Sequence, residues 1–199
     1  NKIDVLVVEA DFVFEETIRK AMNLKLIAVS RASVDSVDLD SATERGILVV
    51  NAPGRNANAV AEYALGLMLG LARRIPFTHQ YTKQGHWQDP TAPYLSLRGV
   101  ELGGKTLGIV GFGHVGSYLS RIVKGIGMRI LVYDPYVADL PHGVEPSTLE
   151  NLMHLSDFIS IHLPLNSETE TLIDGGLLSL MKNSAYIINC SDVAVIDQR

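Results

Sequence analysis

The stretch TLGIVGFGHVG, residues 106–116, decides the fold. Its first five residues have the apolar composition of a buried parallel strand, and the pattern of residues 115–126 predicts a helix. Between them Gly111, Gly113 and Gly116 form G-x-G-x-x-G. In this motif the first glycine allows a tight turn, the second lets the backbone approach a pyrophosphate, and the third lets helix and strand pack closely. Because a helix N-terminus attracts phosphate, we predict a dinucleotide site here.

An acidic residue closes the next predicted strand. Asp134 follows residues 129–133 and lies about twenty residues beyond Gly111, where dinucleotide-binding units place an acid. A carboxylate at this point accepts hydrogen bonds from the adenosine ribose and repels a 2′-phosphate, so the pattern favours NAD over NADP. The alternative is that Asp134-Pro135 only starts a turn.

Short strand patterns alternate with helix patterns along most of the chain. The predicted strands are residues 3–8, 24–29, 47–50, 106–110, 129–133, 158–163 and 185–190. Repeated β–α units imply parallel sheets, so we predict an α/β fold with two Rossmann-like or flavodoxin-like domains. Loop signals between Pro76 and Leu102 place the boundary: residues 1–98 form the first, substrate-binding domain and residues 99–199 the second, dinucleotide-binding domain.

Both domains are expected to be incomplete. A full dinucleotide-binding sheet has six strands, and we identify four from residue 106 onward, so the second domain should lack its carboxyl-terminal part. The first domain should lack its opening strand. Ser147-Thr148-Leu149-Glu150 reads as a capping box that opens a further helix.

A long helix is predicted over residues 59–74, capped by Asn58 and closed by Pro76. It is apolar nearly all the way round, which indicates burial on several sides, between domains or between subunits. We therefore expect a homodimer. The alternative is a plain core helix.

Composition excludes several classes of protein. The net charge is −5 and no basic stripe is present, so we expect no nucleic-acid partner. The longest strongly apolar stretch, residues 63–72, is too short to span a bilayer. Cys190 is the only cysteine and cannot form an internal disulfide, which favours the cytoplasm. We expect no metal site.

Further segments occur in a specific order and spacing: residues 38–53, 59–62, 85–87, 102–108, 127–128, 133–135, 156–157, 162–165 and 181–182. Together with the glycine motif they resemble the D-isomer-specific 2-hydroxyacid dehydrogenases, in particular the phosphoglycerate dehydrogenase-like branch. The resemblance implies a two-domain enzyme that moves a hydride between NAD and a 2-hydroxy or 2-keto acid. It does not by itself exclude a non-catalytic NAD(H)-binding regulator or redox sensor on the same fold. A third alternative, a structural fragment without a ligand, conflicts with the intact glycine motif.

The resemblance also implies site residues. Besides the three glycines, the residues implied to contact the cofactor are His114, Val115, Asp134, Pro164, Thr169, Cys190, Ser191 and Asp192. The residues implied to face the substrate carboxylate are Arg31, Ala32, Ser33 and Asn56.

Two departures from the family pattern affect the chemistry. Asp192 stands where the family has an arginine that clamps the substrate carboxylate, so an acidic substrate would meet repulsion there. The family's catalytic histidine and its carboxylate partner lie beyond the end of this chain, so we expect this chain alone to be inactive. Among the histidines present, His162 is favoured as a packed or cleft-lining residue over a catalytic one.

Overall fold

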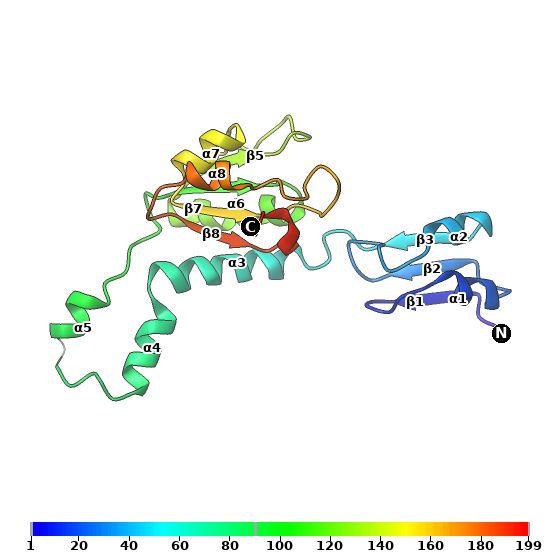
Figure 1. The fold of residues 1–199 in the computed structure, drawn as a ribbon, viewed down its shortest axis with the longest axis horizontal. Helices are drawn as coiled ribbons and strands as arrows, with labels where there is room; N and C mark the ends of the chain where they lie inside the picture. Colours follow the sequence, from blue (N-terminus) through cyan, green and yellow to red (C-terminus); the bar gives the residue numbers. More distant parts are fainter. Residues whose placement is uncertain (1, 90, 199) are drawn as a thin grey trace. The chain divides into compact units, whose positions relative to one another are not determined.

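The computed structural model describes residues 2–89 and 91–198 (Figure 1). Contacts divide the chain into two compact units, Asn1–Asn56 and Ala57–Arg199. Both units contain parallel sheets only, which confirms the predicted α/β class. In the described part of the chain, no helix is long and apolar enough to cross a membrane, and no group of histidine, cysteine and acidic side chains could hold a metal ion.

The first unit is a three-stranded parallel sheet with two short helices. Its elements are β1 (Val5–Val8), α1 (Glu15–Lys20), β2 (Leu26–Val29), α2 (Leu39–Glu44) and β3 (Leu48–Asn51), and the sheet order is β1-β2-β3. Ile18 and Ala42 from the helices pack with Ile27 from the sheet in one core. Gly46, at φ +62°, ends α2 in the left-handed conformation that favours glycine, so β3 can start two residues later.

The second unit is a five-stranded parallel sheet in the order β6-β5-β4-β7-β8. Its strands are β4 (Thr106–Val110), β5 (Arg129–Tyr133), β6 (Glu145–Pro146), β7 (Phe158–Ile161) and β8 (Tyr186–Asn189). Its helices are α3 (Ala57–Ala72), α4 (Ile75–Lys83), α5 (Thr91–Ser96), α6 (His114–Ile126), α7 (Leu149–Leu155), α8 (Gly175–Ser179) and the 3-10 turn η1 (Val193–Val195). The strand order reverses between β4 and β7, which is where open α/β sheets bind ligands.

The sequence prediction was wrong at several local points. Strand β6 was missed because it has only two residues, one of them a proline at the sheet edge, and carries no apolar pattern. The cap of α7 is Thr148, whose Oγ1 accepts a hydrogen bond from the Asn151 amide, so the predicted capping box is shifted by one residue. Pro76 lies in the first turn of α4, where proline is tolerated, rather than in a loop.

Helix α3 begins at Ala57, one residue before its predicted cap, and packs along α6 and β8 (Figure 1). Ala61, Ala64 and Met68 are buried in the core of the second unit. By contacts, therefore, α3 belongs with the second unit; the boundary between residues 98 and 99 rests on loop signals and stays a prediction. Other apolar side chains of α3 are exposed, namely Tyr63, Leu67, Leu69 and Leu71.

Candidate functional site

The turn between β4 and α6 requires glycine at two positions. Gly111 has φ +91°, and a Cβ there would lie 2.5 Å from the carbonyl oxygen of His162 at the end of β7. A Cβ on Gly116 would lie 2.2 Å from the carbonyl oxygen of Gly111. Both contacts are shorter than real carbon atoms allow, so these glycines let β4, β7 and α6 meet at one point.

Gly113, unlike Gly111 and Gly116, is not packed against a neighbouring backbone. It is the N-cap of α6, and a Cβ there would meet nothing within 4 Å, so the backbone faces open space. No side chain caps α6, which leaves the amide groups of its first turn free to bind an anion. The cradle that a Cβ would fill, in front of uncapped amides on a 13-residue helix, fits a pyrophosphate.

Asp134 ties the end of β5 to this turn. Its Oδ2 accepts a hydrogen bond from the Phe112 amide at 2.7 Å, and its Oδ1 accepts one from the Tyr136 amide at 2.9 Å. Asp134 thus starts a turn, as the alternative interpretation held, and also holds the glycine turn. A carboxylate offers about four acceptor positions, so capacity remains for two ribose hydroxyls.

A cavity of about 260 Å³ lies against these residues. Of the predicted cofactor residues, its lining includes Gly111, Gly113, Asp134, Pro164 and Thr169. It also includes residues that the prediction did not assign to the cofactor: Tyr133, Pro135, Tyr136, His162, Leu163, Asn166, Glu168 and Leu172. The predicted cofactor residues outside this lining are His114, Val115, Gly116, Cys190, Ser191 and Asp192.

The segment after β7 is held in shape by its own side chains. Asn166 Oδ1 accepts hydrogen bonds from the amides of Glu168 and Thr169 at 2.9 and 3.0 Å. The hydroxyl of Thr169 donates to the Pro164 carbonyl at 2.5 Å. The Asn-x-x-Thr spacing of a side-chain-stabilised turn is the signal that could have identified this wall of the cavity.

Tyr136 and Glu168 join two sides of the cavity. The Tyr136 hydroxyl donates a hydrogen bond to the Glu168 carboxylate, and this bond raises the pKa of Tyr136. Glu168 therefore places a second carboxylate on the same cavity as Asp134. Two negative charges make this cavity unfavourable for an additional phosphate.

His162 is a neutral, mostly buried wall of the cavity. Its Nε2 lies 2.8 Å from the hydroxyl of Ser160, and its Nδ1 is buried without a hydrogen-bond partner among the described residues. Burial lowers the pKa of His162 to about 4. The imidazole is therefore uncharged at neutral pH, which suits a wall residue better than a proton donor.

The polar side chains that follow β8 accept hydrogen bonds from nearby backbone amides. Ser191 Oγ accepts a hydrogen bond from the Leu163 amide at 2.7 Å, which joins the ends of β7 and β8. Asp192 Oδ1 accepts one from the Ala194 amide at 2.9 Å and caps η1. Burial raises the pKa of the Cys190 thiol, which disfavours the nucleophilic thiolate.

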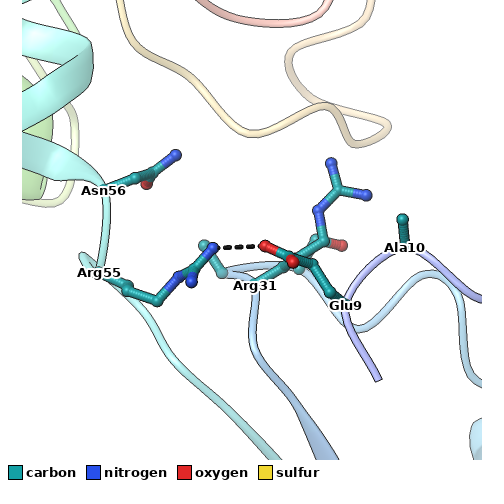
Figure 2. Close-up of a pocket in the computed structure, with 7 residues that line it drawn as sticks. Glu9, Ala10, Arg31, Arg55 and Asn56 are labelled. Atoms are coloured by element: carbon teal, nitrogen blue, oxygen red, sulfur yellow. Dashed lines mark hydrogen bonds and ion pairs between the residues drawn. The ribbon is translucent and has the colours of Figure 1, made fainter. Parts of the chain in front are cut away.

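A second pocket, of about 520 Å³, lies within the first unit (Figure 2). It brings together all four residues predicted to face the substrate, Arg31, Ala32, Ser33 and Asn56. The residues that sequence reasoning missed are Glu9, Ala10 and Arg55. Glu9 follows β1 as Arg31 follows β2, and carboxyl ends of neighbouring parallel strands meet at one sheet edge, so this topology was the available signal.

The charges of this pocket are unequal. Arg55 Nη2 lies 2.6 Å from Glu9 Oε1, forming an ion pair. Arg31 has no ion-pair partner in residues 2–89 and 91–198. Two guanidinium groups and one carboxylate leave one positive charge, so the pocket favours an anion.

This chain is similar to known proteins over nearly its whole length. The family model described as "D-isomer specific 2-hydroxyacid dehydrogenase, NAD binding domain" matches residues 65–199. The D-3-phosphoglycerate dehydrogenase of Methanocaldococcus jannaschii is 39% identical, over 98% of this chain and 37% of its own length. The hydroxypyruvate reductase of Thermotoga maritima is also 39% identical, over 99% of this chain and 63% of its own length.

A solved structure agrees with these matches. The D-lactate dehydrogenase of Aquifex aeolicus, complexed with NAD and lactic acid, has a TM-score of 0.83 and 31% identity, and covers 98% of this chain and 59% of its own. The chain thus spans less than two thirds of the length of each of these three proteins.

The two glycines that flank the start of α6 should respond differently to alanine. We expect Gly113→Ala to fold normally, because its Cβ enters open space, but to bind NAD at least tenfold more weakly, which is about 1.4 kcal/mol. Gly116→Ala should lower the free energy of unfolding by about 1–3 kcal/mol through overpacking. Calorimetric titration and thermal denaturation measure the two effects. Wild-type NAD affinity in Gly113→Ala would contradict the site.

His162 should make stability depend on pH. Its pKa is about 4 when folded and about 6.5 when unfolded, so between these values the unfolded state binds more protons and stability falls as pH falls. Between pH 7 and pH 5 this group should cost on the order of 2 kcal/mol. We expect His162→Gln to lose that part of the pH dependence, measured by urea titration of the β7 amide signals. His154→Gln, on the exposed side of α7, is the control; equal slopes in both variants would refute the assignment.

Proposed function

We propose a function from the premise that this chain belongs to the D-isomer specific 2-hydroxyacid dehydrogenase family, as the match over residues 65–199 shows. The resemblance seen in the sequence is thereby confirmed, and the matched region is an NAD-binding domain. The proposed activity of the whole protein is transfer of a hydride between NAD and a 2-hydroxy or 2-keto acid. The observation that carries this proposal is the cavity whose lining includes Asp134 and Gly113, the N-cap of α6.

In this proposal the second unit binds and orients the cofactor. The amides that open α6 hold the pyrophosphate in front of Gly113, and His114, Val115 and Gly116 supply that first turn. Asp134 accepts hydrogen bonds from the adenosine ribose, while Asp134 and Glu168 together disfavour the 2′-phosphate of NADP. NAD, when bound, accepts or returns the hydride.

The first unit supplies the acid-binding pocket. Arg31 offers a guanidinium that forms no ion pair with any described residue, and the Asn56 amide and the Ser33 hydroxyl lie in the same lining. An arginine is suited to a carboxylate because its fork donates two parallel hydrogen bonds. We propose that this pocket receives the carboxylate of the hydroxy or keto acid.

Asp192 remains a departure from the family. The resemblance places it at the position of a carboxylate-clamping arginine, yet its side chain accepts the Ala194 amide and caps η1. We propose that Cys190, Ser191 and Asp192 border the nicotinamide side without a positive clamp, which leaves Arg31 as the main anion contact. The relatives named above are enzymes, which supports this proposal over a non-catalytic NAD-binding regulator.

We also propose a homodimer and a cytoplasmic location. The exposed apolar side chains of α3, Tyr63, Leu67 and Leu71, support the dimer, because exposed apolar side chains that lie close together often mark an interface. Use of a single cysteine supports the location. Light scattering that gives the mass of one chain at micromolar concentration would overturn the dimer.

The activity is tested on the natural protein purified from its own cells. We expect it to oxidise NADH with at least one of glyoxylate, hydroxypyruvate and pyruvate, and to prefer NADH to NADPH. Asp134→Asn keeps one oxygen that can accept a backbone amide but removes the second acceptor and the charge, so the preference for NADH should fall about tenfold or more. The measurement is the loss of NADH or NADPH absorbance over time.

Two outcomes of these measurements would change the proposal. Binding of NADH without turnover of any 2-keto acid would contradict the enzymatic proposal and favour the regulator. Turnover with an unchanged NADH preference in Asp134→Asn would keep the activity and remove Asp134 from the cofactor site.

A further inference from the structure

The pocket of the first unit contains two arginines, Arg31 and Arg55. One guanidinium is enough to bind the carboxylate of an acid with a single negative charge. Figure 2 shows Arg55 joined to Glu9 by the ion pair, while the guanidinium of Arg31 stands apart from that pair. Glu9, Arg31 and Arg55 are the charged residues of the lining. One guanidinium is thus available to a ligand and the other is occupied by an acid of the protein.

The backbone fixes where these charges lie. Glu9 directly follows β1, and Arg31 lies two residues beyond the end of the neighbouring strand β2. The Ala52 amide donates to the Arg31 carbonyl at 2.9 Å, and Asn51 Nδ2 donates to the Ala32 carbonyl at 2.6 Å. These two hydrogen bonds join the loops after β2 and β3, so they fix the position of the backbone that carries Arg31.

A second anionic group on a ligand would meet both a competitor and a repulsive charge. To reach the Arg55 fork it must displace Glu9, which already accepts from Nη2. Any anion that binds beside the intact pair lies near the Glu9 carboxylate, and like charges at contact distance weaken binding about fivefold even where solvent screens them well. Both side chains are more than half exposed, so this screened limit is the appropriate one.

We propose that Glu9 is a specificity-determining residue that withholds Arg55 from the ligand. The pocket then selects 2-hydroxy or 2-keto acids with a single negative charge over those that carry a second anionic group such as a phosphate. This inference rests on the proposed function, because it takes the pocket as the acid-binding site. If the inference holds, the acid preferred by this chain resembles those in the names of the hydroxypyruvate and glyoxylate reductases, and differs from the phosphorylated acid in the name of the phosphoglycerate dehydrogenase.

The test compares two acids on the full chain with saturating NADH. D-lactate carries one negative charge and 3-phosphoglycerate carries a carboxylate and a phosphate; dissociation constants come from amide shifts in NMR titrations. We expect Glu9→Gln to strengthen 3-phosphoglycerate binding about fivefold or more and to change D-lactate binding less than about twofold. Glu9→Ala should act in the same direction, which guards against an effect of the glutamine side chain.

Glu16→Gln is the matched control, because it removes the same charge from an exposed ion pair on α1 outside the pocket. An unchanged ratio of the two affinities in Glu9→Gln, or an equal change in Glu16→Gln, would overturn the inference and leave the proposed function intact. If neither acid shifts the amides of Ala32 and Ser33 in any variant, the acid-binding pocket itself is wrong and the inference falls with it.

Discussion

The second unit depends on the close approach of two backbones, Gly111 against the carbonyl oxygen of His162. No side chain fits between them, so the ends of β4 and β7 can meet only when residue 111 is glycine. The Asp134 carboxylate fixes the same turn from the other side by accepting the Phe112 amide. The cavity exists because three strand ends are held around one turn, and α6 begins there with uncapped amides.

The chain separates two kinds of electrostatic environment. In the second unit, the uncapped first turn of α6, which attracts phosphates, follows Gly113 in the wall of a cavity whose lining also holds Asp134 and Glu168, which limit how much negative charge can enter. The pocket of the first unit carries a surplus positive charge from Arg31. A dinucleotide and a small organic acid need these opposite arrangements, and each environment lies within one unit of the chain.

Sequence patterns predicted the parts of this structure that depend on local, strongly periodic signals. The seven long strands, the glycine turn and Asp134 belong to that group, because burial between helices demands apolar runs and the turn demands glycine. Strand β6 was not predictable in this way. It has only two residues, Glu145 and Pro146, which carry no apolar pattern and pair with β5 at the edge of the sheet. Glu9 and Arg55 were missed because their pairing joins residues far apart in sequence. His162 was predicted as a wall residue, but its bond to Ser160 and its lowered pKa follow from burial that the sequence alone does not reveal.

The proposed function depends most on the second unit binding a dinucleotide at the start of α6. The most direct measurement is an NMR titration of the isotope-labelled chain with NADH, in which every amide reports separately. We expect saturable binding of one NADH per chain, with the largest shifts at Gly113, at the first turn of α6 and at residues flanking Asp134. Absence of saturable binding, or shifts that leave Gly113 and the α6 amides unmoved, would contradict a dinucleotide site at this turn.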